Sequence, residues 1–146
     1  MLQAAPLSPA IAASLEKWHA MVASGNLEGL PDLLHPQASF RSPMAHKPYA
    51  SAQAVALIVT TVIGVFTQFK YHRQFVNEDG MSVVLEFSAM VGDKAIKGID
   101  MVRFDDDGLI VDFEVMVRPM SGLQALGAEM GARLGALLPA FKTANT

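Results

Sequence analysis

One acidic residue interrupts an otherwise apolar pattern. Residues of a strand alternate between the two faces of a sheet, and Asp100 falls in the apolar set of its segment, which comprises Ile96, Gly98, Val102 and Phe104. A carboxyl group held among apolar neighbours tends to keep its proton, because its pKa rises by as much as ~3–5 units. A protonated carboxyl donates a hydrogen bond and can stabilise a developing enolate oxygen. The alternative is a solvated or salt-bridged Asp100, with Arg73 as a candidate partner.

Four strands are expected around this acid, over residues 70–77, 82–91, 95–104 and 109–118. Short turns rich in Asp and Gly separate them, and such turns join antiparallel neighbours in a meander. Two further apolar sets should share the face of Asp100: Val83, Leu85, Phe87 and Ala89, and Val111, Phe113, Val115 and Val117.

Helical patterns flank the strands. Ser8 and Pro9 are typical of a helix start, and apolar residues recur at helical spacing up to Ser24. A short second helix over 26–34, a third from Ser51 toward Phe69 and a last one from Ser121 are also expected. Helices followed by an antiparallel sheet predict an α+β fold. At 146 residues the chain fits one domain, 1–146, with a disordered tail after Pro139.

Composition excludes several classes of partner. Hydrophobic residues make up 51% of the chain and charged residues 17%, with a net charge of −3, so no basic stripe for nucleic acid or anionic lipid is present. There are no cysteines, which excludes disulfides and thiolate chemistry. The first residues lack the basic start of a secretory signal, so we expect a cytoplasmic protein. Residues 48–69 are uncharged, but their polar residues favour a half-buried helix over a membrane span.

Two stretches carry a family resemblance. The residues Gly98 to Phe104, followed by Asp107 to Ile110, resemble the last hairpin of ketosteroid isomerase and its SnoaL-like relatives in the nuclear transport factor 2-like superfamily. Residues 15–43 resemble the opening helices and first strand of that family, so the likeness spans about Ser14 to Arg118. It implies a cone-shaped, curved antiparallel sheet packed against N-terminal helices, with a C-terminal helix and one apolar pocket. Because this scaffold carries many activities, the resemblance is more specific for fold than for chemistry.

The catalytic residues of that family carry over only in part. Asp100 matches the acid that stabilises the oxyanion, while Trp18 stands where the family has a tyrosine and Ser42, before Pro43, stands where it has its aspartate base. An indole N–H donates a hydrogen bond but is no acid, and a serine hydroxyl cannot abstract a carbon-bound proton unaided. The resemblance therefore implies Asp100 and Trp18 as catalytic candidates, without the base of a ketosteroid isomerase.

The remaining lining of the predicted pocket is mostly apolar. The expected substrate-binding residues are Phe40, Ser42, Tyr49, Leu85, Phe87, Val102, Phe104, Phe113 and Val115. Arg41, Tyr71 and Arg73 are further possible polar anchors. The four histidines show no close pairing, which gives no support to a metal site. No glycine-rich phosphate loop is present, so we expect no cofactor.

Three functions fit this pattern. The first is a cofactor-independent enzyme of isomerase, cyclase or dehydratase type acting on an apolar carbonyl compound. The second is a non-catalytic domain that binds a small hydrophobic molecule in the same pocket. The third is a dimerisation module whose interior is filled by its own side chains. A homodimer through the outer sheet face is expected in any case, since that face mixes methionines with opposite charges; its residues include Met90, Ile99, Met101, Met116, Glu86, Arg103, Glu114 and Arg118.

Overall fold

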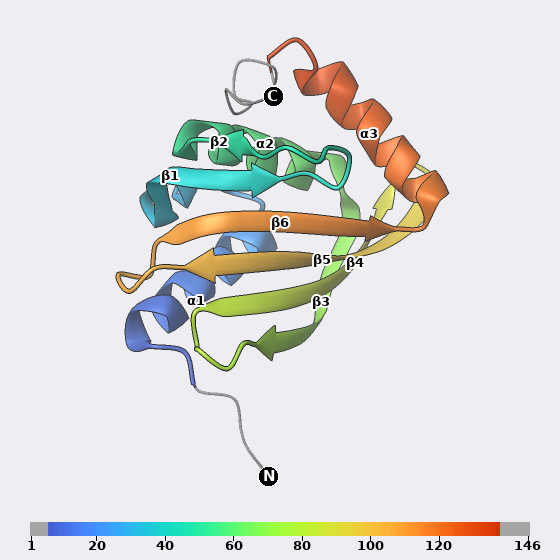
Figure 1. Cartoon of the computed structure of the whole chain (residues 1–146). Helices are drawn as coiled ribbons and strands as arrows, with labels where there is room; N and C mark the ends of the chain where they lie inside the picture. The colour runs from blue at the N-terminus through green and yellow to red at the C-terminus, as the bar shows by residue number, and fades with distance from the viewer. Residues whose placement is uncertain (1–5, 138–146) are drawn as a thin grey trace.

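The computed structural model describes residues 6–137, so the expected tail after Pro139 lies outside the described residues. Three α-helices, one short 3-10 helix and six strands follow one another along this part of the chain (Figure 1). The elements are α1 (Pro9–Ser24), η1 (Leu30–Leu33), β1 (Leu34–Arg41), β2 (Tyr49–Ala50), α2 (Ala52–Val65), β3 (Thr67–Val76), β4 (Ser82–Val91), β5 (Lys94–Phe104), β6 (Ile110–Arg118) and α3 (Met120–Leu134).

The strands form one open, curved sheet in the order β2-β1-β6-β5-β4-β3. The meander β3 to β6 is antiparallel throughout, as predicted, and the α+β fold class is confirmed. The sheet is not purely antiparallel, because β1 runs parallel to β6. A parallel pair needs a long crossover, and here α2 and the first three meander strands lie between β1 and β6 in the chain.

The helices cover one face of the sheet and leave the other open. Figure 1 shows α1 and α2 behind the bent sheet and α3 beside the end of β6. The predicted inward set of β4 is confirmed, since Val83, Leu85, Phe87 and Ala89 are all buried. In β5 the whole predicted set is buried, including Asp100. The core therefore lies in the concave face of the sheet, under the helices.

Two predicted helices are shorter than expected. The one predicted over 26–34 is reduced to the 3-10 turn Leu30–Leu33, because Asn26 Oδ1 accepts the Glu28 N–H at 3.0 Å in a local turn. Strand β1 already begins at Leu34, since the residue before Pro36 prefers an extended backbone. The helix predicted toward Phe69 ends at Val65, where aromatic and β-branched residues favour β3 instead.

None of the helices within residues 6–137 is long and apolar enough to span a bilayer. The uncharged segment 48–69 contributes only a 14-residue helix, α2, and then turns into β3. A membrane-crossing helix needs about 20 residues.

Two serines fix the position of α1 against the sheet. Ser8 Oγ accepts the Ile11 N–H at 3.3 Å and caps the helix. The buried Ser14 hydroxyl donates to the Gly108 carbonyl at 2.6 Å, which ties α1 to the β5–β6 turn. A glycine is required at this turn, because its φ is +83° and a Cβ atom there would lie 2.6 Å from the Ala10 carbonyl oxygen. This docking sets Trp18, one turn further along α1, beneath the sheet.

Candidate functional site

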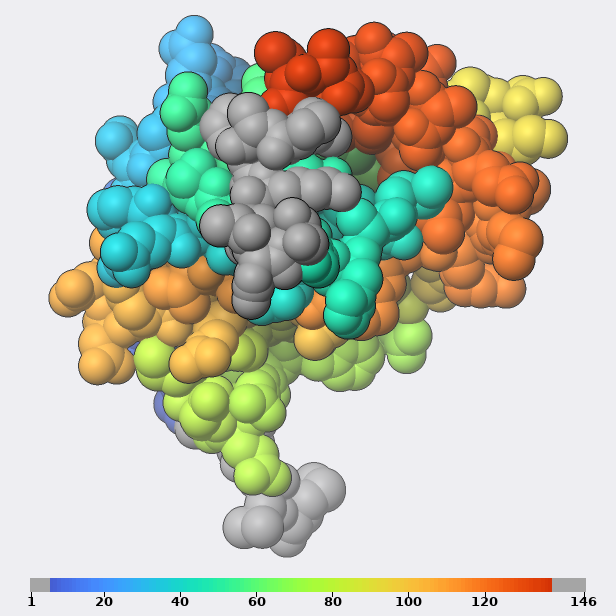
Figure 2. Space-filling model, turned by 45° about the horizontal axis from the view of Figure 1, so that its top comes forward, coloured from blue at the N-terminus to red at the C-terminus, as the bar shows by residue number. Residues whose placement is uncertain are grey.

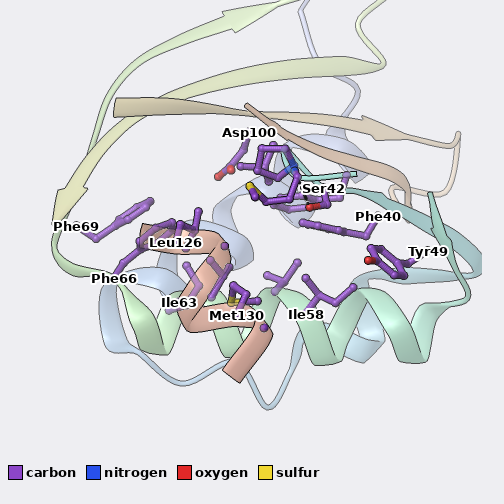
Figure 3. Close-up of a pocket in the computed structure, with 18 of the residues that line it drawn as sticks. Phe40, Ser42, Tyr49, Ile58, Ile63, Phe66, Phe69, Asp100, Leu126 and Met130 are labelled. Atoms are coloured by element: carbon purple, nitrogen blue, oxygen red, sulfur yellow. Dashed lines mark hydrogen bonds between the residues drawn. The ribbon is translucent and has the colours of Figure 1, made fainter. Parts of the chain in front are cut away.

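A partly enclosed, largely apolar cavity of about 180 Å³ lies between the concave sheet face and helices α2 and α3. Figure 3 shows Asp100 on the sheet side, Ile58 and Ile63 on the α2 side, the pair Phe66 and Phe69 at one end and Tyr49 at the other. The lining residues are Trp18, Phe40, Ser42, Pro43, Met44, Tyr49, Ile58, Val59, Val62, Ile63, Phe66, Phe69, Asp100, Phe113, Val115, Leu126, Gly127, Met130 and Gly131. A dry engineered cavity of about 150 Å³ is enough to bind benzene, so this one has room for a ring-sized ligand.

Asp100 is the only carboxyl group among the described residues that line this cavity. It is 6% exposed, and its Oδ2 accepts the Tyr71 hydroxyl at 2.6 Å. The indole N–H of Trp18 donates to the same tyrosine oxygen at 3.0 Å. Arg73, the alternative partner weighed from the sequence, instead binds Glu86 with two hydrogen bonds of 2.7 Å.

Burial dominates the titration of Asp100. Loss of hydration raises the pKa of Asp100 to about 7, while the Tyr71 hydrogen bond acts in the opposite direction. The pKa of Tyr71 is raised well above its usual value, first by burial and then by the adjacent Asp100 carboxyl. Near neutral pH the cavity therefore holds a carboxyl group that can gain or lose a proton, next to a neutral phenol.

The second oxygen of Asp100 borders the cavity. Among the described residues, Oδ2 has a hydrogen-bond partner, Tyr71, and Oδ1 has none. No fully buried side-chain oxygen or nitrogen in this part of the chain lacks a partner, so Oδ1 is not sealed inside protein. Because Asp100 is itself part of the cavity wall, Oδ1 is available to a ligand.

Aromatic rings hold this acid and its partner in place. Phe69 contacts the Tyr71 ring edge-on with 4.8 Å between centroids and stacks on Phe87 at 5.1 Å. On the other side, the Trp18 ring meets Phe113 edge-on at 5.4 Å. Such pairs restrict ring rotation as well as burying apolar area. The hydroxyl of Tyr71 is thereby aimed at Asp100 by rings from three strands and α1.

The predicted site residues divide into two groups. The cavity wall contains Asp100, Trp18, Phe40, Ser42, Tyr49, Phe113 and Val115. The other four, Leu85, Phe87, Val102 and Phe104, are buried in the core but are not among the lining residues. They share the inward face with Asp100, yet neighbouring side chains fill the space over them. Strand parity alone cannot separate wall from core, because both point the same way.

Sequence reasoning missed two parts of the site. Tyr71 was expected only as one of several polar anchors, although its shared parity with Phe69 is a signal that it points inward. The β3–β4 register shifts between Tyr71 and Gln74, so Phe75 is 49% exposed despite the same parity. His72 lies on the outer side, with Nε2 2.7 Å from Ser88 Oγ. The α2 and α3 walls were not assigned, since periodicity does not say which helix face meets a cavity.

The mouth of the cavity is formed by α3 and the loop after β1. Figure 2 shows the segment that follows β1 lying beside α3. A Cβ atom on Gly127 would lie 2.6 Å from the Met44 methyl group, so the methionine rests directly on the helix backbone. On Gly131, one turn further, a Cβ atom would meet no described atom within 4 Å. Gly127 thus lets Met44 pack against α3, whereas Gly131 leaves open space at the cavity rim.

Other polar groups of the described chain are not arranged as a second centre. Among residues 6–137, no group of three or more His, Cys, Asp or Glu side chains is placed to hold a metal ion. The acidic run after β5 forms a turn in which Asp105 Oδ1 accepts the N–H groups of Asp107 and Leu109, each at 2.9 Å. The chemistry of the described residues is concentrated at Asp100.

The chain belongs to the SnoaL-like domain family, whose model matches residues 15–113. Its fold is that of the nuclear transport factor 2-like proteins. The family resemblance found in the sequence is therefore confirmed.

Solved structures extend this assignment. A protein named as a steroid delta-isomerase from Pseudomonas aeruginosa is 65% identical, with a TM-score of 0.88, and the match covers 92% of this chain and 98% of that one. An uncharacterised protein with a cystatin-like fold from Silicibacter pomeroyi is 27% identical, with a TM-score of 0.83 and the same coverage of 92% and 98%. A nuclear transport factor 2-like protein of unknown function from Mesorhizobium loti shares the fold at 17% identity, with a TM-score of 0.66 over 79% of this chain and 100% of that one. The search of curated proteins found no match.

Proposed function

We propose that this protein binds an apolar, ring-containing carbonyl compound and activates it for isomerisation, with Asp100 at the carbonyl oxygen. The observation that carries the proposal is a buried carboxyl group in the wall of an apolar cavity, with one oxygen that no described residue binds. A carboxylic acid that donates to a carbonyl draws electron density toward the oxygen, which acidifies the adjacent C–H bonds and favours the enol. The name of the 65% identical relative, a steroid delta-isomerase, supports the same class of reaction.

Cavity size limits the part of the ligand that can be enclosed. At about 180 Å³ the space is close to that of the cavity that holds benzene, about 150 Å³. One or two fused rings fit that volume, whereas a four-ring steroid would have to extend through the mouth past Met44 and Gly131. We therefore propose a one- or two-ring ligand, or one end of a larger molecule.

The second candidate is binding without turnover. Shifting a double bond needs a base that removes a proton from one carbon and delivers it to another, as well as a donor at the oxygen. Asp100 is the only carboxyl group among the described lining residues, and the hydroxyls of Ser42 and Tyr49 are weak bases. This shortage of bases favours a carrier or sensor of the same ligand class.

Ligand binding in the cavity is tested by a substitution that fills the cavity mouth. Gly131→Leu would place a side chain into open space at the cavity rim, and leucine is a better helix former than glycine. Calorimetry with the two-ring ketone tetralone should show at least about a tenfold loss of affinity without loss of thermal stability. The matched control is Gly64→Leu, on an exposed helix position outside the cavity wall. Equal affinities in the two variants would contradict a ligand site in this cavity.

Turnover separates the two candidates. Wild type and Asp100→Asn are compared for conversion of an unconjugated keto-steroid into its conjugated isomer, followed by absorbance. Turnover in the wild type that falls by at least about a hundredfold in the variant supports the isomerase. Tetralone binding with no turnover in either protein supports the binding function alone.

We also propose that two copies pair through the outer sheet face. No described helix covers that face in Figure 1, and it carries Met101 and Met116 at 36% and 46% exposure beside a hollow bordered by Lys97 and Arg118. In sedimentation analysis the chain should behave as twice its 15.6 kDa mass. Met116→Lys should give monomers, while Ala13→Lys, at an exposed position of α1 on the other side of the sheet, should not. A wild-type monomer at high concentration would overturn the proposal.

A further inference from the structure

Met44 lies between the cavity and the solvent. It belongs to the loop between β1 and β2, it is one of the residues that line the cavity, and it is 52% exposed. Figure 2 shows the segment that follows β1 lying beside α3. An apolar side chain that faces a cavity on one side and solvent on the other forms part of the rim. Met44 therefore occupies the mouth, between its loop and α3.

The end of the Met44 side chain packs on α3 at Gly127. A Cβ atom on Gly127 would lie 2.6 Å from Met44 Cε, 3.2 Å from Sδ and 3.5 Å from Cγ. A side chain at position 127 would therefore displace the methionine, whose flexible end can move. One turn further, a Cβ atom on Gly131 would meet no described atom within 4 Å. Of these two neighbouring glycines, only Gly127 carries the methionine.

We infer that Met44, packed on Gly127, closes the cavity mouth and determines the largest ligand that the cavity encloses. The inference rests on the proposed function and adds a size class to its ligand. With Met44 in place the cavity measures about 180 Å³, which fits a compound of one or two rings. A larger ring system needs the space that the Met44 side chain occupies.

Both ends of the loop that carries Met44 are anchored to the sheet. Before the loop, Arg41 Nε donates to both carboxylate oxygens of Asp112 at 3.1 Å. After the loop, Tyr49 is paired with Phe40 across β2 and β1 and is 7% exposed. Methionine is unbranched and has three rotatable bonds. The mouth can therefore open by rotation of the Met44 side chain, while the anchors stay in place.

Selectivity between a two-ring and a four-ring ketone tests the role of Met44. In calorimetry, Met44→Ala should raise the affinity for a four-ring keto-steroid, relative to that for tetralone, by about tenfold, because the shortened side chain leaves the mouth open. Met120→Ala, the same substitution at a 74% exposed position outside the cavity wall, should leave this ratio unchanged. A purely structural role of Met44 would lower both affinities together. An unchanged ratio in Met44→Ala would overturn the inference and leave the binding site intact.

Gly127→Ala tests the contact with α3 while Met44 itself is intact. The added methyl group would displace the end of Met44, so the affinity ratio should rise in the same direction as in Met44→Ala. Gly131→Ala is the matched comparison, because it brings the same gain in helix propensity. Its methyl group would meet no described atom and would narrow the mouth, so the ratio should not rise. A rise in both glycine variants, or in neither, would overturn the inference.

The rate at which a ligand leaves supplies a second readout. Trp18 is the single tryptophan of the chain and lines the cavity, so its fluorescence reports on occupancy. In stopped-flow measurements, tetralone should leave Met44→Ala and Gly127→Ala several-fold faster than the wild type, because no side chain has to move aside. Equal dissociation rates in the three proteins would overturn the inference. If tetralone does not bind the wild type at all, the proposed function fails as well.

Discussion

Two acids on neighbouring strands, Asp100 on β5 and Glu86 on β4, have the same low exposure of 6% and opposite surroundings. Glu86 points to the outer face, where Arg73 binds it at 2.7 Å and Lys97 at 3.0 Å. These hydrogen bonds, that of Arg73 first, lower the pKa of Glu86 to about 2. Asp100 points into the core, where it meets one hydroxyl and no described cation, and burial raises its pKa to about 7.

This difference separates a structural acid from a reactive one. Paired with two cations, Glu86 stays ionised over the whole physiological range and serves the outer surface. Asp100 can exchange its proton near neutral pH, which is the range in which acid–base chemistry is most effective. A similar exposed fraction thus accompanies opposite behaviour, because Glu86 has two cations beside it at the surface, whereas Asp100 is desolvated in the core without one.

The largest expected effect comes from Asp100→Asn, which removes the ionisation but keeps an acceptor for Tyr71. Because the pKa of Asp100 rises on folding from its usual 3.8 to about 7, the contribution of Asp100 to stability is largest below pH 4 and is lost as the pH rises through 7. That interval of about three pH units corresponds to at most about 4 kcal/mol. At pH 8 the melting temperature of the variant should be about 5 °C or more above that of the wild type. At pH 4 the two melting temperatures should be equal.

The control for this comparison is Asp93→Asn, an exposed acid in the β4–β5 turn. It should not alter the pH dependence of the melting temperature measured by calorimetry. A wild type whose stability is as insensitive to pH as that of Asp100→Asn would show that Asp100 is not desolvated.

A smaller effect of opposite sign is expected from Glu86→Gln. The pKa of Glu86 falls on folding from 4.5 to about 2, so its contribution is present above pH 4.5 and is lost as the pH falls through 2. At pH 7 the variant should melt a few degrees below the wild type, because two ion pairs are broken. Melting curves from pH 7 down to pH 3 should show the difference shrinking. A constant difference would mean that packing of the side chain, and not its charge, matters.

The smallest effect separates the two cations that hold Glu86. Arg73 donates two hydrogen bonds of 2.7 Å to the carboxylate, whereas Lys97 makes a single contact at 3.0 Å. Arg73→Gln should therefore raise the pKa of Glu86 more than Lys97→Gln, as followed by carboxyl NMR. The reverse order would indicate that the planar pair with Arg73 does not persist in solution.

Local patterns predicted much of the fold because they follow from backbone geometry. Gly80, Gly92 and Gly108, in the three turns of the meander, all have positive φ. Because glycine adopts positive φ more readily than other residues, its presence in the sequence indicates such turns. Alternation along β4 and β5 identified the buried face correctly. Alternation predicted the directions of the β3 side chains less well, because the register between β3 and β4 shifts between Tyr71 and Gln74.

The sequence predicted the site only through Asp100, which departs from the apolar pattern of its strand. Asp100 is an acid in an apolar set, so burial and a raised pKa could be expected from the sequence. Its partner Tyr71 is 29 residues away in the chain, and no local rule links the two. The same holds for Trp18 and Tyr71, which are 53 residues apart, and for the helix residues that close the cavity.

The sequence by itself determined the strands, their turns and the presence of one carboxyl group on the concave face, because these depend on residue type and period. Only the tertiary structure decided that Trp18 and Tyr71 would meet at that carboxyl, that Arg73 would serve the other face, and that α2 and α3 would leave a cavity above it. The reason is physical: alternation fixes the direction of a side chain, whereas its partners depend on how distant segments pack.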